Sequence, residues 1–290
     1  MMAELNGNNT NMEIKTLLND VLEYAFPSNT HPLEKLQRFS VECQRKEAKK
    51  DGDYNADLHH IRIFNLSRDS KEILLTALHD LSHHIEYTFY GESAHKERFY
   101  NYYHNVLVTA IGMKLLLKMD LSLLDMKERD KLEKAHGAIH YWKIPDVTYK
   151  ENIFYLDVKN GYEFRDTLKD WGYKYLSLEE VWRGEFTRDC VWEEKSELNE
   201  LGIDDESILV HPAVDFQTTF VYYLVIRNAY DHRLTLRKLG YKYGAFNVGK
   251  RNWVKKIDAK DLNEEREKVE GLMGVSLKVL KDLPPSGSIK

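Results

Sequence analysis

A repeated segment in the second half of the chain places the strongest constraint on its fold. FYLDVKNGYEFRDTLKDWGYKY begins at Phe154, and YYLVIRNAYDHRLTLRKLGYKY begins at Tyr222, 68 residues later. Residues identical at this offset include the pairs Tyr155/Tyr223, Leu156/Leu224, Asn160/Asn228, Tyr162/Tyr230, Arg165/Arg233, Leu168/Leu236, Gly172/Gly240 and Tyr175/Tyr243. Each copy predicts a strand, an asparagine cap, a short helix, a glycine stop and a hairpin that ends near Trp182 or Trp253. We therefore expect two small α/β units, each near the smallest size that folds alone.

The two copies differ in charge. Residues 221–257 contain nine basic side chains and one acidic side chain, a formal charge of +8, whereas residues 193–206 contain seven acidic side chains and one lysine, a charge of −6. Basic side chains interleaved with aromatic ones are typical of surfaces that bind a nucleic-acid backbone or single strand. The residues expected to form such a surface are Arg227, Arg233, Arg237, Lys238, Lys242, Lys250, Arg251, Trp253 and Lys255. The alternative is a solvated basic face that the acidic segment neutralises.

The composition excludes several classes of protein. Apolar residues make up 42% of the chain, which is enough for packed cores and excludes global disorder. Only Cys43 and Cys190 are present, far apart, so neither a disulfide framework nor a thiolate zinc knuckle is expected. The polar N-terminus has no signal-peptide core, and no apolar run approaches the ~18 residues of a membrane span. We therefore expect a cytoplasmic protein with no membrane partner.

The first half of the chain is expected to be mostly helical. The predicted elements are helix over 12–50 with breaks at Pro27 and before Pro32, a strand over 59–66, helices over 71–90 and 93–118, and a polar helical connector over 126–142. Asp69 and Ser70 are expected to cap the helix that Gly91 then ends, and Ser93 is expected to cap the following helix.

Two histidines on the helix before Gly91 suggest a metal site. His79 and His83 are four residues apart in ALHDLSHHIEY, so they lie on one helical face about one turn apart. Imidazole nitrogens arranged in this way can bind one metal ion at about 2 Å. A catalytic zinc site needs a third protein ligand, for which His95 is the best candidate and Glu97 the competitor. Such a pair alone is more often incidental, but the apolar helix, the adjacent acid and the third histidine together favour a metal site.

The acid that follows His79 is Asp80, whereas zinc hydrolases with the H-E-x-x-H pattern have glutamate at this position. That glutamate accepts a proton from zinc-bound water and returns it to the leaving amine. Aspartate is one methylene shorter, so its carboxylate falls back by about 1.5 Å. Misplacement of this order can lower a rate about a hundredfold. We therefore expect Asp80 to be the catalytic base of a centre whose proteolysis is weakened or lost.

These motifs resemble those of the SprT-like zinc metallopeptidases and related bacterial or phage proteins. The matching stretches are IRIFNL, LLTALHDLSHHIEY and GESAHKERFYNYYHNVLVTA, within about residues 55–120. The resemblance implies a zincin-like domain with zinc ligands at His79, His83 and His95, with the acid at Asp80, and a link to DNA-associated proteins. The C-terminal units resemble small modules found beside phage and DNA-processing domains.

Two other classes of function remain open. LTALHDLSHH also resembles the H-D helix of HD-domain phosphohydrolases, in which His79 and Asp80 would both bind metal and His59 or His60 would be the upstream ligand. That domain is all-helical, and the predicted strand after His60 disfavours it. The other alternative is a non-enzymatic, zinc-braced binding or inhibitor protein of phage or mobile-element origin, in which the repeats grip a nucleic acid or a protein.

Together these patterns predict an α+β protein. We expect an N-terminal zincin-like helical domain with a small sheet, followed by two small α/β repeats. The expected divisions are a disordered leader at 1–11, a zincin-like metal-binding domain at 12–145, a first repeat at 152–190, an acidic linker at 191–219, a basic second repeat at 220–258, and a C-terminal helix and tail at 259–290. The expected function is that of a zinc-dependent metallopeptidase with a nucleic-acid- or protein-binding C-terminal region.

Overall fold

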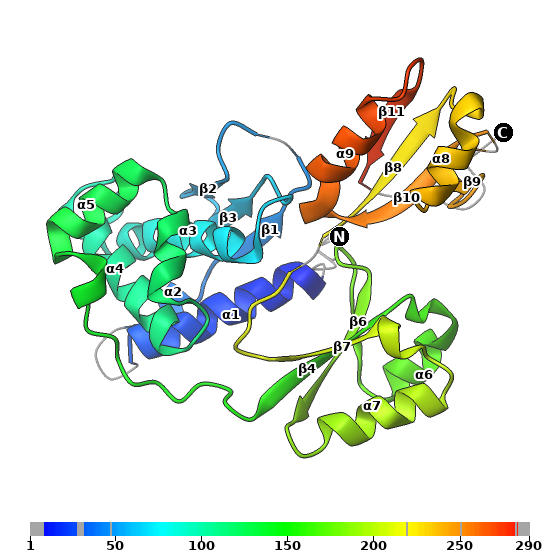
Figure 1. Ribbon diagram of the computed structural model, residues 1–290. Coiled ribbons are helices and arrows are strands. Elements are labelled where there is room, and N and C mark those ends of the chain that lie inside the picture. Colours follow the sequence, from blue (N-terminus) through cyan, green and yellow to red (C-terminus); the bar gives the residue numbers. More distant parts are fainter. Residues whose placement is uncertain are drawn as a thin grey trace, which may run out of the picture. The chain divides into compact units, whose positions relative to one another are not determined.

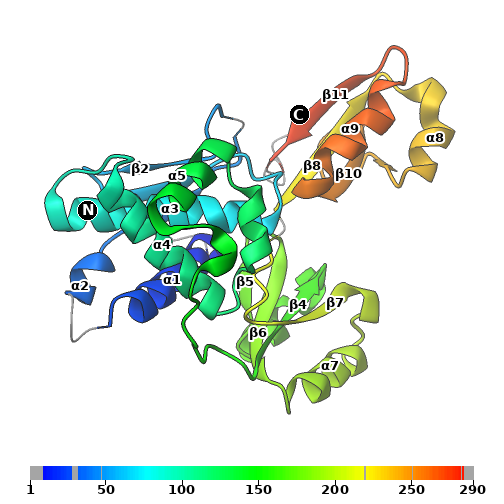
Figure 2. The same ribbon diagram turned by 60° about the vertical axis from the view of Figure 1, so that its left-hand side comes forward.

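Figure 1 and Figure 2 show a computed structural model of the chain, which describes residues 9–27, 32–46, 48–218, 220–249, 251–281 and 283. The chain divides into two compact units, one of residues 1–65 and 69–218 and one of residues 66–68 and 219–290. Each unit mixes helices with strands, which confirms the expected α+β class. Within the described ranges, no helix is long and apolar enough to cross a membrane.

The first unit begins with helices packed around a small sheet (Figure 1). The strands are β1 (Ser40–Cys43), β2 (Gly52–Asn55) and β3 (His60–Ile63), in the order β1-β3-β2. β1 runs parallel to β3 and β2 antiparallel to it, so β2 is an edge strand of the sheet as described. The helices are α1 (Asn9–Ala25), α2 (Leu33–Leu36), α3 (Ser70–Tyr90), α4 (Glu97–Gly112) and α5 (Met126–His136), with 3-10 turns at Lys118–Leu123 and Ile139–Tyr141.

Helix α3 carries the histidine motif and has the predicted caps. The Asp69 side chain accepts a hydrogen bond from the Lys71 backbone N–H (2.8 Å), and Glu72 accepts one from the Asp69 N–H (3.0 Å). Gly91 ends the helix with a left-handed φ of 70°, a conformation that glycine adopts without strain. The helix packs against α4, β2 and β3, and its buried apolar residues include Leu74, Leu78, Leu81 and Ile85.

Two expectations for the first half are wrong. Residues 12–50 do not form one helical stretch, because Val41 and Cys43 are buried on alternate positions and form β1 beside β3. Helix α4 begins at Glu97 rather than near Ser93. The Ser93 hydroxyl does not cap that helix, because it is hydrogen-bonded to Glu86 on α3.

The expectation of a disordered leader at 1–11 is wrong for residues 9–11. Helix α1 already begins at Asn9, and the buried Thr10 hydroxyl donates a hydrogen bond to Glu179 (3.0 Å). Asn9 Nδ2 donates a hydrogen bond to the Tyr175 carbonyl (2.7 Å). These contacts stabilise the start of the helix; residues 1–8 lie outside the described ranges.

A four-stranded antiparallel sheet completes the first unit. Its elements are β4 (Ile153–Lys159), α6 (Arg165–Asp170), β5 (Lys174–Leu176), β6 (Val181–Thr187), α7 (Val191–Glu200) and β7 (Ile208–Pro212), with strand order β5-β6-β4-β7. Leu156, Val158 and Leu168 are buried in its core together with Val191 and Leu198 of α7.

The second unit contains a sheet of the same design. Its elements are β8 (Val221–Arg227), α8 (Arg233–Lys238), β9 (Lys242–Tyr243), β10 (Trp253–Asp258), α9 (Leu262–Glu270) and β11 (Ser276–Leu280), with strand order β11-β8-β10-β9. In both sheets the first strand pairs with the third and fourth strands, both antiparallel. A short 3-10 turn and a six-residue helix follow the first strand in each case.

The domain boundaries expected in the second half are therefore wrong. The "linker" at 191–219 contains α7 and β7, and β7 pairs with β4. The "helix and tail" at 259–290 contains α9 and β11, and β11 pairs with β8. A buried central strand needs hydrogen-bond partners on both edges, and a Trp-terminated hairpin supplies only one of them.

Candidate metal centre

Three histidines converge where α3 meets the turn before α4. His79 and His83 lie one turn apart on α3, and His95 lies in the turn. His95 Nε2 is 2.9 Å from His79 Nε2 and 3.2 Å from His83 Nε2. One ligand atom from each residue lies within 4.8 Å of the other two, so the predicted metal ligands are brought together. The competitor Glu97 is exposed and does not belong to this group.

Asp80 is hydrogen-bonded to His79 on the side of the ring away from this cluster. Its Oδ1 lies 2.9 Å from His79 Nδ1, which we assign as the donor. The Asp80 side chain is buried, at 4% exposure, and its Oδ2 has no hydrogen-bond partner within the described residues. A carboxylate that accepts from Nδ1 orients the imidazole and leaves Nε2 as the nitrogen that could bind a metal ion in place of a proton.

A second carboxylate orients His83 through a serine. The Ser93 hydroxyl donates its hydrogen to Glu86 Oε2 (2.8 Å), so Ser93 must accept from His83 Nδ1 (2.7 Å). His83 therefore also carries its proton on Nδ1 and presents a bare Nε2 to the cluster. The sequence did not point to Glu86 or Ser93 in this role, although Glu86 follows His83 by three residues on the same face of α3.

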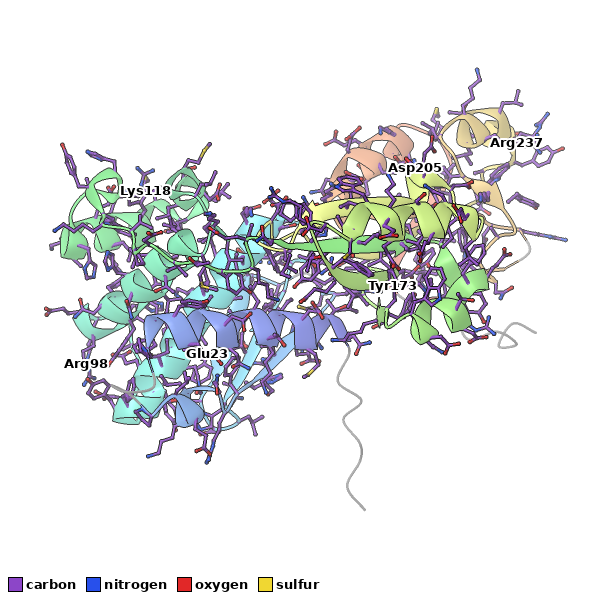
Figure 3. All side chains as sticks on the ribbon, turned by 90° about the horizontal axis from the view of Figure 1, so that it is seen from below. Glu23, Arg98, Lys118, Tyr173, Asp205 and Arg237 are labelled. Carbon is purple, nitrogen blue, oxygen red and sulfur yellow. The ribbon has the colours of Figure 1, made fainter. Side chains whose placement is uncertain are left out.

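Glu86 also holds the turn that contains His95. Its Oε2 accepts the backbone N–H of Ala94 (3.0 Å), and its Oε1 lies 3.4 Å from Arg98 Nε. Arg98, labelled in Figure 3, is held in turn by Glu92 (2.7 Å). One buried carboxylate thus positions two of the three histidines.

Aromatic rings form the wall behind the cluster. Phe99 of α4 is fully buried, and its ring centre lies 4.3 Å from that of His83, 4.8 Å from that of His95 and 5.1 Å from that of His79. Tyr103, one turn further along α4, lies edge-on to His79 at 5.5 Å. These rings shield one side of the cluster from water and restrict the imidazoles to one orientation.

The protonation of the cluster suits a cation. Burial disfavours charge on His79, but hydrogen bonds with Asp80 and Glu128 outweigh burial and raise the pKa of His79 to about 9. Burial, together with the neighbouring His79 and His95, lowers the pKa of His83 to about 3. Burial and His79 likewise lower the pKa of His95. At neutral pH the three Nε2 atoms, which face one another, therefore share one proton, that of His79. A divalent cation in its place could be bound by all three nitrogens.

Glu128 is a further acidic neighbour that the sequence did not reveal. It comes from the first turn of α5, and its Oε1 lies 3.2 Å from His79 Nε2. The segment 126–142 was predicted only as a polar connector. No local pattern links Glu128 to the histidines 33 to 49 residues before it, because only the packing of α5 on α4 brings it close.

Comparison with known proteins gives no identity. No family model, no curated protein and no solved structure matches this chain. Function must therefore be argued from the side chains themselves.

The other histidines noted in the sequence lie apart from this cluster. His84 is buried, and its ring nitrogens lie 2.9 Å from the Leu36 carbonyl and 3.0 Å from the Tyr54 hydroxyl. The same hydroxyl lies 3.0 Å from His59 Nδ1. His60 is paired with Ser40 and Glu42. None of these belongs to the metal-binding group found in the described residues.

The predicted nucleic-acid surface is only partly exposed. Six of its members are exposed, namely Arg227, Arg233, Arg237, Lys238, Lys242 and Arg251. Trp253 is buried, at 5% exposure, so the expectation that its face is open for stacking is wrong: it packs against Tyr243. Lys255 forms an ion pair with Glu265 of α9 (2.9 Å), and Lys250 lies outside the described residues.

Both sheets carry the same arrangement of exposed aromatic and cationic groups. Arg165 lies 4.8 Å from the ring centre of Tyr162, and Arg233 lies 4.9 Å from that of Tyr230. These tyrosines are 73% and 75% exposed. A Tyr–Trp pair with ring centres 5.1 Å apart also occurs in each sheet: Tyr175/Trp182 and Tyr243/Trp253.

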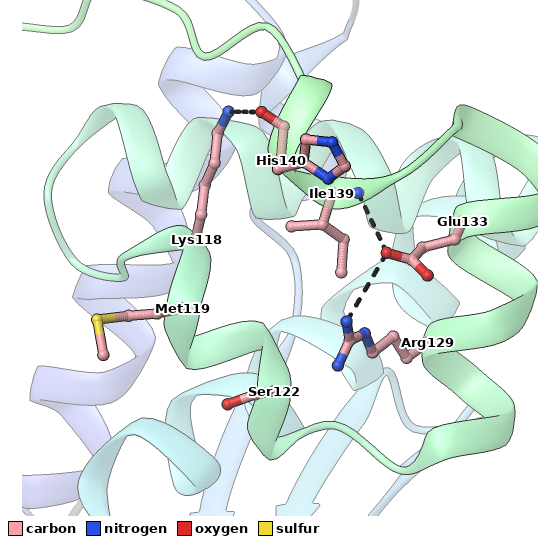
Figure 4. A pocket seen from close by; sticks show the side chains of 7 residues that line it. All are labelled: Lys118, Met119, Ser122, Arg129, Glu133, Ile139 and His140. Carbon is pink, nitrogen blue, oxygen red and sulfur yellow. Dashed lines mark hydrogen bonds and ion pairs between the residues drawn. The ribbon is translucent and has the colours of Figure 1, made fainter.

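A cavity of about 300 Å³ opens on the other side of α5 (Figure 4). Its lining residues are Lys118, Met119, Ser122, Arg129, Glu133, Ile139 and His140. The polar groups in it are largely engaged: Lys118 donates to the His140 carbonyl (3.0 Å), and Glu133 accepts from the Ile139 N–H (3.2 Å). None of the three clustered histidines lines this cavity.

Proposed function

We propose that this protein is a zinc-dependent hydrolase of peptide bonds, with zinc held by His79, His83 and His95. The observation that carries the proposal is the convergence of three Nε2 atoms. In two of these rings the other nitrogen, Nδ1, is already hydrogen-bonded, to Asp80 in His79 and to Ser93 in His83. Three nitrogen ligands with one open position are the ligand set of a catalytic zinc site, whereas structural sites have four protein ligands. Bound zinc would polarise a carbonyl group and lower the pKa of a coordinated water.

A peptide substrate is supported by the edge strand beside the centre. Among the described strands, β2 lies at one edge of its sheet, and an edge strand can pair with an extended peptide. The strand passes directly by the acid of the motif, since a Cβ added to Gly52 would lie 2.5 Å from Asp80 Oδ2. A peptide paired with β2 would therefore run beside α3, the helix that carries His79 and His83. The resemblance to SprT-like metallopeptidases agrees with this substrate class.

The two alternative functions are less well supported. A phosphohydrolase of the HD type needs Asp80 as a metal ligand, but its Oδ1 lies against Nδ1 of His79, away from the converging nitrogens. A non-enzymatic scaffold protein, in which zinc only stabilises the fold, would have the same three ligands. It would differ from the proposed enzyme only in lacking hydrolytic activity. The edge strand, and a group of three rather than four possible protein ligands among the described residues, favour the enzyme.

Elemental analysis of the purified chain tests the proposal. The wild type should contain one zinc per chain, and His95→Ala should lose it. Asp80→Ala should keep zinc with affinity lowered about 10–100-fold, since Asp80 acts through His79. Loss of metal from Asp80→Ala with retention in His95→Ala would instead support the phosphohydrolase. Stoichiometric zinc without chelator-sensitive cleavage of denatured casein or a mixed peptide library would support the scaffold.

We also propose that the two four-stranded sheets are copies of one module and that the second copy binds a nucleic-acid backbone. The matching Tyr162–Arg165 and Tyr230–Arg233 pairs favour a binding role, because exposed pairs that bury little surface contribute little to folding. Residues 221–280 contain thirteen basic and seven acidic side chains, a formal charge of +6, whereas residues 153–212 contain seven and fifteen, a charge of −8. The basic copy therefore suits phosphates, and the acidic copy suits a protein.

Binding of a fluorescent single-stranded oligonucleotide of random sequence, measured from low to high salt, tests this second proposal. Affinity should fall steeply with salt, because each phosphate contact releases counterions. Affinity that does not depend on salt, or no binding at low salt, would contradict it.

A further inference from the structure

The acid of the histidine motif does not face the position where a base is needed. Asp80 Oδ1 is bonded to His79 Nδ1, whereas the lone pair available to metal is on Nε2, on the other side of the ring. Asp80 Oδ2 is buried beside Gly52. A general base must lie within hydrogen-bond reach of the proton that it accepts, directly or through one water. Asp80 is therefore placed as the partner of His79 rather than as a base.

Glu128 is the carboxylate on the metal-facing side. Its Oε1 lies 3.2 Å from His79 Nε2, at the edge of the converging nitrogens. It does not belong to the group of ligand atoms that lie within 4.8 Å of one another, which contains only His79, His83 and His95 within the described residues. Its carboxylate therefore lies beside the nitrogens that would hold zinc, where it could accept a proton from a water molecule.

Helix α5 holds this carboxylate in place. Asp125 caps the helix by accepting the Lys127 N–H (2.9 Å). Leu132, one turn beyond Glu128 on the same face, is fully buried, and α5 packs on α4. Glu133, on a different face, lines the cavity of Figure 4. Glu128 is thus presented by an anchored helix, as a catalytic group must be.

Tyr103 gives an independent sign of a polar occupant at this place. Its side chain is fully buried, yet its hydroxyl has no hydrogen-bond partner within the described residues. Its ring lies edge-on to that of His79, with ring centres 5.5 Å apart, so this residue borders the histidine cluster. Buried polar groups without a protein partner are generally bonded to water or a ligand.

We infer that Glu128, and not Asp80, is the general base of the proposed hydrolase, an inference that rests on the proposed function. Glu128 accepts a proton from water as the water oxygen bonds to the carbonyl carbon and the C=O electron pair moves onto the carbonyl oxygen. Glu128 then returns the proton to the amide nitrogen as the C–N bond breaks, which leaves a carboxylic acid and an amine. Asp80 keeps its hydrogen bond to His79 throughout and acts as a positioning residue.

Hydroxamate binding to the full-length chain tests this role. Acetohydroxamic acid is titrated into cobalt-loaded protein and followed by the visible absorption of the metal, with zinc content measured separately. Glu128→Gln should keep one zinc per chain but lose hydroxamate affinity by at least about tenfold, because an amide accepts the proton of the probe poorly. Asp130→Asn, which removes the same charge from an exposed position two residues along α5, should behave as wild type.

Two outcomes would overturn the inference. Loss of zinc from Glu128→Gln, with retention in Asp130→Asn, would make Glu128 a ligand. Unchanged hydroxamate affinity in metal-loaded Glu128→Gln would show that Glu128 is not the general base. If Glu128→Gln does not fold, Glu128→Ala replaces it with the same expectations. A wild type that binds no divalent metal would refute the proposed function itself, and this inference with it.

Discussion

Replacing Glu86 with glutamine should weaken zinc binding although Glu86 is not one of the proposed zinc ligands. The carboxylate is buried, at 1% exposure, and accepts hydrogen bonds from the Ser93 hydroxyl and the Ala94 N–H. It also lies 3.4 Å from Arg98 Nε. An amide can accept from Ser93 and Ala94 only with its oxygen at the position of Oε2, which places its NH2 group against the Arg98 guanidinium; in the opposite orientation both hydrogen bonds are lost. In Glu86→Gln the turn that carries His95 and the serine that orients His83 are therefore held by weaker, uncharged contacts or by none.

The size of the effect follows from these contacts. Hydrogen bonds to a charged group contribute roughly 1.5–3 kcal/mol each, and loss of a residue that orients a metal ligand lowers metal affinity by about 10–100-fold. We therefore expect zinc affinity to fall by about 10–100-fold in Glu86→Gln. Ser93→Ala should fall toward the lower end of this range, because the Ala94 N–H still holds the turn to Glu86.

Chelator competition at fixed pH measures the zinc dissociation constant, and thermal unfolding of the metal-free proteins reports on folding. Glu92→Gln is the matched control, because Glu92 is an exposed acid that also contacts Arg98 (2.7 Å) but none of the histidines. Its affinity should equal that of wild type. Wild-type zinc affinity in a folded Glu86→Gln protein, or an equal loss in Glu92→Gln, would refute the positioning role of Glu86.

Three further predictions concern other parts of the chain. Gly52→Ala places a Cβ 2.5 Å from Asp80 Oδ2, so it should lower stability by about 1–3 kcal/mol and zinc affinity by about tenfold, as urea unfolding and chelator competition would measure. Asp157 is buried, which raises its pKa, but hydrogen bonds from Arg183 (both 2.7 Å) and from His211 outweigh burial and hold the pKa below its usual range. Its contribution to stability is therefore complete above the unfolded-state pKa of about 3.9 and is lost as the pH falls through the lower folded-state value. Arg183→Ala should cost about 3–5 kcal/mol at pH 7 in urea unfolding and progressively less below about pH 4; a difference independent of pH would contradict this. In the second unit, Arg237→Gln should reduce the slope of log affinity against log salt for single-stranded oligonucleotides by about 0.7, and an unchanged slope would exclude a phosphate contact.

The cluster of three histidines could be predicted from the sequence because its geometry is mostly local. Helical spacing fixes the relation of His79 to His83, and Gly91 fixes the turn that returns His95 to them. The residues that orient or accompany these histidines could not be predicted in the same way. Ser93 has the sequence context of a helix cap, and Glu128 becomes a neighbour of His79 through the packing of α5 alone.

The prediction of a linker at 191–219 rests on the high negative charge of the segment and overlooks the spacing of its apolar residues. Val191 and Leu198, seven residues apart, mark the buried stripe of α7, and Glu193 and Glu197 between them are exposed. Ile208 is likewise buried, as the first residue of β7. The spacing of a few apolar residues is therefore a better guide to the structure of a highly charged segment than its net charge.

X-ray absorption at the zinc edge of the full-length, zinc-loaded chain tests the central claim most directly. The proposed centre predicts three imidazole nitrogens, from His79, His83 and His95, at about 2.0–2.1 Å and the outer-shell scattering typical of histidine rings. His95→Ala should reduce the imidazole count to two. A spectrum with sulfur ligands, or one with two or fewer imidazoles in the wild type, would contradict the three-histidine centre.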